Sequence, residues 1–464
     1  MTLEKSQQSP YVGPRPFERE ERQLFFGRYK EIRNLLSLAF AHRVIILYAQ
    51  SGAGKTSLLN AGMIPLLEEQ DFEVLPIARV GGLIPEGVKP ERIPNLYVFN
   101  SLLSCAKGDI DSLIQMSLAQ FLKELPHRKN KEGLPSPRFL IFDQFEELFT
   151  LFPERWRERE RFFQQVREAI DEDKFLRLLL VIREDYIAHL DSFVSLLSKA
   201  FPTRFYLERL RKDAALQAIT GPLKNTNRTF AEGVAEKLVE DLMQIRVQSV
   251  TGMTVEIEGE FVEPVQLQMV CHNLWQELPT NTTIITYDHL QAFGDVDQAL
   301  SVFYFKAVRS VTKIAHIRES TLRNWFEHNL ITQAGTRGMA HRGPQKTSSI
   351  PNSVVDILEN LHIIRGEWRA GAGWYELTHD RLIGPIQKSN HKWRRTRFRR
   401  LATLWLVLGT LSYLAGGVAF LLERPKFIYI YRYFMFLTSM FLLVAYIYMV
   451  PLFRRLLRKL FIKD

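Results

Sequence analysis

The sequence predicts an α/β fold around a parallel β-sheet, with a two-helix membrane hairpin near its C-terminal end. A short apolar run at residues 43–48 leads through a glycine-containing turn into a helical pattern, as a parallel strand followed by a helix does. Two further apolar runs of strand length end at Asp143 and Arg183. The hairpin is indicated by two uncharged apolar stretches at residues 401–422 and 433–453.

The charge of the chain is concentrated in its last part. Residues 391–464 hold 14 of the 61 Lys and Arg residues and 2 of the 51 Asp and Glu residues, which leaves 47 basic and 49 acidic residues in the first 390. The net charge of +10 therefore belongs to the tail. This distribution favours an anionic membrane surface over nucleic acid as the partner, and we expect no nucleic-acid binding.

The two cysteines, Cys105 and Cys271, are far apart and form no pattern typical of zinc binding. This usage fits a reducing cytoplasm without a disulfide framework. The N-terminal residues contain no apolar core of a signal peptide, so none is expected.

The two apolar stretches are long enough to cross the hydrocarbon core of a bilayer, which takes roughly 20 residues. Basic residues flank the pair on both outer sides, at 392–400 and 454–459, and this predicts that both termini lie in the cytoplasm. The alternative is two buried helices of a soluble domain, which rarely lack charge over such lengths twice in succession.

The turn after the first strand has the sequence AQSGAGKT and resembles a P-loop, with Ala49 in the place of the first glycine. Such a loop wraps backbone N–H groups around phosphates at a helix N-terminus. Lys55 is expected to reach the β- and γ-phosphates, and the Thr56 hydroxyl to bind Mg²⁺. The predicted nucleotide-binding residues of this segment are Gly52, Ala53, Gly54, Lys55, Thr56 and Ser57.

A second strand, within RFLIFDQFEELF, ends at Asp143, the expected second Mg²⁺ ligand. Either Glu146 or Glu147 is expected to orient the attacking water, and the sequence leaves the choice open. The third strand ends at Arg183, whose guanidinium can meet the γ-phosphate from the strand tip.

Seven segments in order resemble the novel branch of the STAND class of signal-transducing P-loop ATPases. They are PYVGPRPFEREERQLFFGRYKEI, the P-loop, IFDQFEELF, LLLVIREDYIAHL, RFYLERLRKDAALQAITGPL, VEPVQLQMVCHNLW and WYELTHDRLIGPI. The resemblance implies an AAA-related domain with an N-terminal cap at 1–204, a helical domain at 205–280 and a winged-helix-like domain at 281–390. The membrane hairpin would occupy 391–464.

The resemblance also implies roles for single residues. Arg183 would be a sensor of the γ-phosphate, and Phe26, Gly27 and Arg28 would cover the adenine. Pro222 resembles the helical-domain proline near the nucleotide. His379 resembles a winged-helix histidine that contacts the β-phosphate with ADP bound. The alternative is a buried histidine with a structural role only.

Two segments between these motifs predict local structure. Residues 247–263 are β-rich and predict a hairpin. Residues 333–353 are rich in Gly, Ser and Thr and predict an exposed loop.

The functional hypothesis is a switch that binds ATP or ADP with Mg²⁺, hydrolyses ATP slowly and self-associates with ATP bound. Its membrane hairpins would then act as a signalling or defence effector, in response to an unknown trigger or sensor protein. In the alternative, the hairpin is only an anchor for a regulator or scaffold. A third hypothesis is an ATP-dependent interaction module that needs no hydrolysis. Two spans without an intramembrane acidic residue argue against a transporter.

Overall fold

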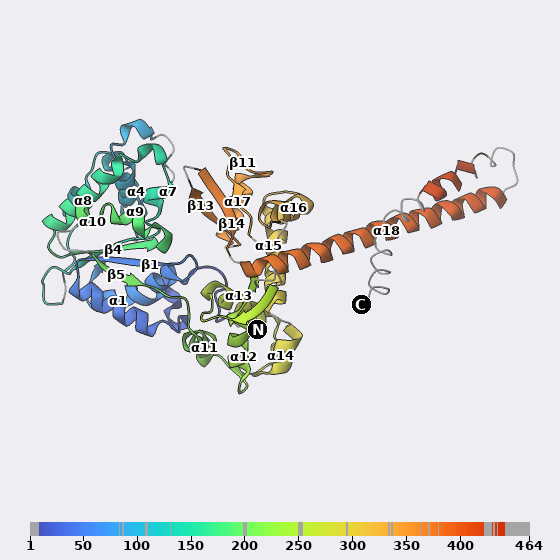
Figure 1. Cartoon of the computed structure of the whole chain (residues 1–464), viewed down its shortest axis with the longest axis horizontal. Coiled ribbons are helices and arrows are strands. Elements are labelled where there is room, and N and C mark those ends of the chain that lie inside the picture. The colour runs from blue at the N-terminus through green and yellow to red at the C-terminus, as the bar shows by residue number, and fades with distance from the viewer. Residues whose placement is uncertain are drawn as a thin grey trace, which may run out of the picture. The chain divides into compact units, whose positions relative to one another are not determined.

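The computed structural model (Figure 1) describes residues 9–440 except 83, 86–87, 107–109, 130, 198–201, 249–253, 294–295, 333–334, 336, 362, 370–371, 379, 422–428, 430–431 and 434. The chain divides into two compact units, Met1–Ile383 and Gly384–Asp464.

A five-stranded parallel sheet forms the centre of the first unit. Its strand order is β2-β3-β4-β1-β5, and the strands are β1 (Val44–Ala49), β2 (Glu73–Val74), β3 (Arg138–Phe142), β4 (Leu176–Arg183) and β5 (Thr203–Tyr206). Residues Ala49 and Arg183 are register partners, so the tips of β1 and β4 end level with each other. The predicted parallel sheet is confirmed, and its strand ends bring distant motifs together.

Both faces of the sheet are covered by helices, because successive strand side chains alternate between the faces. Ile46 packs into one core with the phenylalanines of α8, and Ile45 and Leu47 pack into the other with α1. Figure 1 shows α8 and α10 on one side of the sheet and α1 on the other. The helices of one side are α1 (Tyr29–Ala41), α2 (Lys55–Ser57), the π-helix η2 (Leu58–Met63) and α3 (Ile64–Glu69). Those of the other include α4 (Leu96–Cys105), α6 (Leu118–Glu124), α8 (Glu158–Glu172), α9 (Ile187–Asp191) and α10 (Val194–Leu197).

Short helical elements connect these parts. They are η1 (Arg19–Leu24), η3 (Pro90–Arg92), α5 (Ile110–Leu113), α7 (Glu147–Thr150), η4 (Pro153–Arg155) and η5 (Glu184–Tyr186).

The sheet is followed by a helical part, and β5 crosses the predicted boundary at residues 204–205 because its end pairs with β1. Its helices are α11 (Lys212–Thr220), η6 (Gly221–Asn225), α12 (Val234–Met243), α13 (Pro264–Glu277) and α14 (Tyr287–Phe293). The strands β6 (Thr229–Phe230) and β9 (Ile284–Ile285) pair in parallel. The predicted hairpin is present, three residues earlier than expected, as the antiparallel pair β7 (Gln244–Gln248) and β8 (Thr254–Glu258).

The described residues of the predicted winged-helix region, 281–390, include β9 and α14, three longer helices and a three-stranded antiparallel sheet. The helices are α15 (Val296–Ile314), α16 (Glu319–Asn329) and α17 (Asn352–Asn360). The sheet has the order β10-β14-β13, with β10 (Ala340–His341), β13 (Ile364–Arg369) and β14 (Ala372–Leu377).

The prediction of an exposed loop at residues 333–353 is wrong for much of its length. The segment holds β10 and the pair β11 (Lys346–Thr347) and β12 (Ile350–Pro351). Ile350 and Thr347 are buried, and the Thr347 carbonyl accepts a hydrogen bond of 3.1 Å from the Trp325 indole nitrogen. Polar composition concealed these contacts, because the segment is fixed by backbone pairing and by packing on α16.

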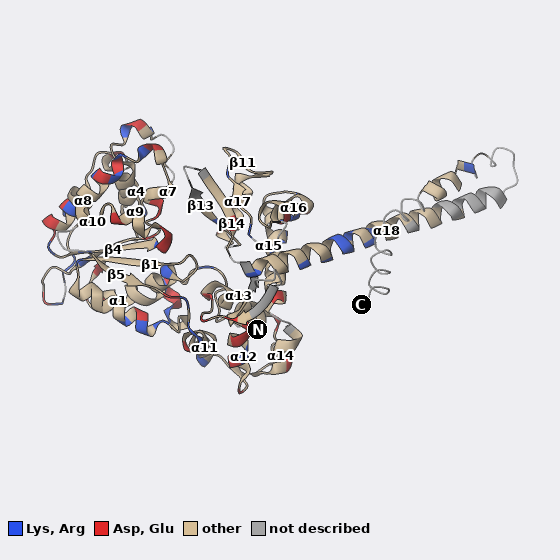
Figure 2. Ribbon diagram, in the orientation of Figure 1, with Lys and Arg blue, Asp and Glu red and all other residues tan. Residues whose placement is uncertain are grey.

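The second unit consists largely of α18 (Ile383–Leu421), which follows the short η7 (Asp380–Leu382) and starts at the last residue of the first unit. Figure 2 shows the basic residues gathered along the first part of this helix. The predicted span 401–422 falls almost entirely on α18, and most of the span 433–453 lies outside the described residues. Within the described part of the chain, no helix is long and apolar enough to cross a membrane, so the structure does not support the predicted hairpin.

Candidate functional site

The P-loop joins the end of β1 to the start of α2. Gly52 and Gly54 have φ angles of +81° and +93°, in the left-handed region that glycine adopts without strain. These two residues turn the backbone so that α2 begins at Lys55. Ala49, the departure from the motif, is fully buried in the core that also contains residues of α1.

Lys55 lies inside the loop that precedes it. Its Nζ donates to the Ala49 carbonyl at 3.2 Å and to the Gln50 carbonyl at 3.1 Å. Burial lowers the pKa of the Lys55 ammonium, and the carboxylates of Glu146 and Asp143 oppose that shift. The ammonium therefore lies inside the loop, where a compact positive charge can meet a bound phosphate.

Thr56 and Asp143 meet at the tips of neighbouring elements. The Thr56 hydroxyl donates to Asp143 Oδ2 at 2.8 Å, and the Gln144 backbone nitrogen donates to Asp143 Oδ1 at 2.8 Å. Mg²⁺ prefers hard oxygen ligands and is commonly held by one or two protein groups together with phosphate oxygens. A hydroxyl and a carboxylate oriented toward each other beside the P-loop fit this ion.

Glu146 and Glu147, the two glutamates after Asp143, have different contacts. Glu146 lines the cavity with Lys55, and its Oε2 accepts from the Arg183 backbone nitrogen at 3.3 Å. Burial raises the pKa of Glu146, while the Lys55 ammonium opposes the shift. Glu147 instead pairs with the Arg79 guanidinium and accepts from the Gly81 backbone nitrogen at 3.2 Å. Glu147 is not among the residues that line the cavity.

Arg183 lies at the tip of β4 and also lines the cavity. Its guanidinium donates to Asp185 Oδ2 at 2.7 Å and lies 5.7 Å from the centre of the Tyr186 ring. With 9% of its surface exposed, this guanidinium is held at the strand tip beside the loop.

The Phe26-Gly27-Arg28 segment connects the loop to the helical part. The Arg28 guanidinium donates to the Ala53 carbonyl at 3.0 Å and pairs with Glu31 at 2.8 Å. Phe26 lines the cavity and packs so closely on η6 that a Cβ at Gly221 would lie 2.3 Å from its ring. A Cβ at Gly27 would lie 2.2 Å from a carbonyl oxygen of α11, so this position also requires glycine.

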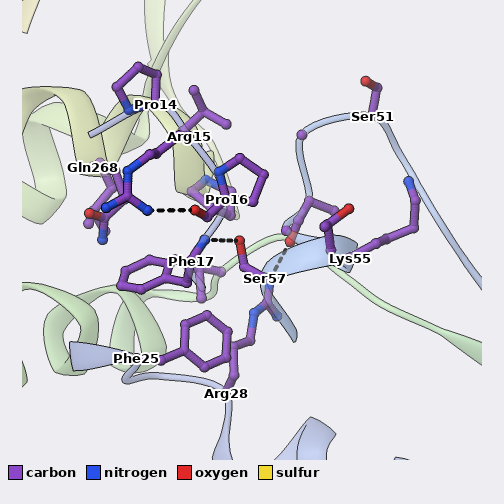
Figure 3. A pocket seen from close by; sticks show the side chains of 18 of the residues that line it. Pro14, Arg15, Pro16, Phe17, Phe25, Arg28, Ser51, Lys55, Ser57 and Gln268 are labelled. Carbon is purple, nitrogen blue, oxygen red and sulfur yellow. Dashed lines mark hydrogen bonds between the residues drawn. The ribbon is translucent and has the colours of Figure 1, made fainter. Parts of the chain in front are cut away.

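A segment at the N-terminus, residues 11–17, runs along the cavity and is here called the strap. Gly13 to Phe17 line the cavity (Figure 3). The Phe17 backbone nitrogen donates to Ser57 Oγ at 3.2 Å, and the Tyr11 hydroxyl donates to the Ile219 carbonyl at 2.7 Å. The strap therefore contacts the P-loop helix at one end and the helical part at the other.

The cavity has a volume of about 250 Å³ and includes residues that the sequence analysis did not assign to the site. Pro264, Leu267 and Gln268 line it from α13, and Phe17 and Phe25 form an edge-to-face pair with ring centres 5.2 Å apart. The segments PYVGPRPF and VEPVQLQ contain most of these residues. Both segments contributed to the family resemblance, but the resemblance gave their residues no role in nucleotide binding.

Two predicted residues are placed differently or not described. Pro222 is buried in η6 and does not line the cavity, whereas Pro264 does. His379 lies outside the described residues.

Comparisons with solved structures find matches at low identity and low TM-score. The Walker-type ATPase of Pyrococcus abyssi is 15% identical and matches 80% of this chain and 98% of its own, with a TM-score of 0.41. The ORC2 protein of Aeropyrum pernix, in ADPNP–ADP complexes, is 12% identical over 79% of this chain and 95% of its own, with a TM-score of 0.38. Cdc6p from Pyrobaculum aerophilum is 12% identical over 79% and 94%, with a TM-score of 0.36.

A search of curated proteins found no match to the sequence. The family model described as Novel STAND NTPase 1 matches residues 10–397, which is most of the chain and contains every element of the site. The chain belongs to the Novel STAND NTPase 1 family and is an ATP-binding P-loop NTPase.

Proposed function

We propose that this protein is a nucleotide-dependent switch that binds ATP or ADP with Mg²⁺, hydrolyses ATP slowly and self-associates in its ATP form. The observation that carries the proposal is the lining of one cavity by three distant parts of the chain. The P-loop, the strap and α13 all contribute residues to it. A nucleotide in this cavity would contact the sheet domain and the helical part together, so the nucleotide state can control how they are held.

The residues at the phosphate end fit ATP chemistry. The Lys55 ammonium and the loop N–H groups are suited to bind phosphate oxygens, and Thr56 with Asp143 is suited to hold Mg²⁺. Bound Mg²⁺ would neutralise charge that develops on the transferred phosphoryl group. Glu146 is the better candidate to orient a water, because Glu147 is engaged by Arg79 and Gly81. Arg183 is suited to contact the γ-phosphate from the tip of β4.

The self-association and membrane steps rest on the sequence. The apolar stretches 401–422 and 433–453 and the basic residues beside them support association with an anionic membrane. We propose that the assembled form acts there as a signalling or defence effector, triggered by a sensor protein that the sequence does not identify. If the C-terminal segment is only an anchor, the protein is a membrane-tethered regulator or scaffold with the same switch.

The experiment that tests the switch is nucleotide binding by the full-length chain in detergent, with its oligomeric state measured by light scattering in ATP and in ADP. Lys55→Ala should abolish ATP binding and ATP-dependent assembly. Lys30→Ala, which removes an exposed lysine of α1, is the matched control and should behave as the wild type. ATP binding without assembly would refute the self-association step, and absence of ATP binding by the wild type would refute the whole proposal.

The membrane step is tested by flotation with vesicles that contain anionic lipid. The full-length chain should float with the vesicles, and a chain ending at residue 390 should not. Equal behaviour of the two chains would rule out the C-terminal segment as the membrane-binding element.

A further inference from the structure

Gln268 is a buried polar residue in the wall of the nucleotide cavity. The proposed switch mechanism gives it no role. It lies in the second turn of α13, lines the cavity and has 9% of its surface exposed. Its Oε1 accepts a hydrogen bond of 3.2 Å from the Val12 backbone nitrogen in the strap. The carboxamide oxygen of Gln268 is thus held by one hydrogen bond, and its NH₂ group is the second polar group of the side chain.

The contact with Val12 settles which end of the carboxamide faces the strap. A backbone N–H can only donate, so the carboxamide oxygen must be the atom that receives it. The remaining group is the NH₂, which can only donate. Within the cavity wall, Gln268 therefore offers a hydrogen-bond donor.

The surroundings of Gln268 suit a flat aromatic base rather than a phosphate. Figure 3 shows Gln268 and Lys55 at opposite sides of the view, with Phe17 and Phe25 below Gln268. Pro264 and Leu267, the neighbours of Gln268 in α13, line the same cavity as the apolar rings of Phe17 and Phe25. Aromatic rings of this kind stack on nucleobases, and a single polar group among them then reads the edge of the base.

We propose that Gln268 is the residue that reads the nucleobase and that its NH₂ selects adenine over guanine. The N1 atom of adenine accepts a hydrogen bond, whereas N1–H of guanine donates one and would face the NH₂ donor to donor. A site built to hydrogen-bond one partner rejects the analogue that leaves its buried polar group unpaired. This inference rests on the proposed nucleotide-binding function of the same cavity.

A purely structural role for Gln268, holding the strap through Val12, is the competing explanation. Gln268→Glu separates the two roles, because a carboxylate oxygen can still accept from the Val12 N–H. The other oxygen then presents an acceptor to the cavity in place of the donor. The variant therefore keeps the hydrogen bond to the strap and replaces the donor that faces the base with an acceptor.

The test compares ATP and GTP affinities of the full-length chain by titration calorimetry in wild type, Gln268→Glu and Gln268→Met. Gln268→Glu should weaken ATP binding by about tenfold or more and weaken GTP binding less, so that the ATP-to-GTP preference falls by about tenfold. Gln268→Met, which is similar in size and has no donor, should bring the preference close to one. Gln276→Glu adds the same charge to the exposed face of α13 and should keep the wild-type preference.

The outcomes separate this inference from the function on which it rests. If wild type binds ATP but both Gln268 variants keep its preference, or lose ATP and GTP equally, Gln268 does not read the base. If wild type binds neither nucleotide, the proposed function and this inference fail together. Thermal melts verify folding, and Gln268→Met carries the test if the charged variant does not fold.

Discussion

At the scale of single residues, the structure separates two adjacent glutamates that the sequence leaves equivalent. Gln144 has a φ of +53°, and the turn that it makes after β3 directs Glu146 into the cavity and Glu147 toward Arg79. The direction of such a turn depends on packing against β4 and Val181, whose carbonyl accepts from the Phe145 backbone nitrogen at 2.9 Å. The sequence of two adjacent glutamates does not show which of them faces the cavity and which faces Arg79.

Glu146→Gln is expected to lower ATP turnover by about 10²-fold or more while ATP still binds, because the variant cannot orient and deprotonate a water. Burial penalises the charged carboxylate, so the thermal midpoint at neutral pH should not fall. Glu147→Gln is the matched control and should keep turnover, with a stability loss of about 1 kcal/mol from its partly exposed ion pair. Phosphate release and calorimetric ATP binding measure both effects. Equal loss of turnover in the two variants would contradict the assignment.

The pH dependence of turnover should report the same carboxylate. Burial raises the pKa of Glu146 above its ordinary value of 4.5, and a general base acts only when it is ionised. As pH falls through this raised pKa, Glu146 becomes protonated and the rate at saturating ATP should decline, at a higher pH than an exposed glutamate would give. The measurement is kcat against pH, and the residual rate of Glu146→Gln should lack this acidic limb.

At the scale of elements, the contact between the Phe26 segment and η6 joins the sheet domain to the helical part. Gly221→Ala would place a Cβ 2.3 Å from the Phe26 ring, with two further ring atoms at 2.6 and 2.8 Å. Gly221 has ordinary helical dihedrals, so alanine would gain about 0.5–1 kcal/mol in helix propensity. Overpacking costs about 1–3 kcal/mol and should prevail.

The expected result of Gly221→Ala is a lower free energy of unfolding together with weaker ATP binding, since the displaced Phe26 ring lines the cavity. Gly82→Ala is the control, because its nearest neighbouring atoms in Asn100 lie at 3.7 Å, an ordinary contact distance. Urea denaturation and ATP titration measure the two effects. Wild-type affinity in a destabilised Gly221→Ala protein would show that the Phe26 contact serves stability alone.

At the scale of the whole molecule, local patterns predicted β1, β3 and β4 and the P-loop, whereas β2, β5 and the far side of the cavity depend on long-range packing. The strands were predictable because buried parallel strands are short apolar runs, and the P-loop because its glycines are required by the turn. The resemblance pointed to Pro222 and gave no role to Pro264, which lines the cavity. Only the packing of α13 against the strap, across about 250 residues of chain, brings Pro264 and Gln268 to the cavity.

This long-range construction predicts that nucleotide binding stabilises distant segments together. ATP should slow amide hydrogen exchange in the P-loop helix, in the strap and in α13, because residues of all three line one cavity. At a concentration of about 100 Kd, binding adds about 2.7 kcal/mol to the stability of the bound form, which sets the scale of the protection. The amides of α15, which contributes no residue to the cavity wall, serve as the internal control. Lys55→Ala should remove all three effects at once, whereas protection confined to the P-loop would show that nucleotide does not join the sheet domain to the helical part.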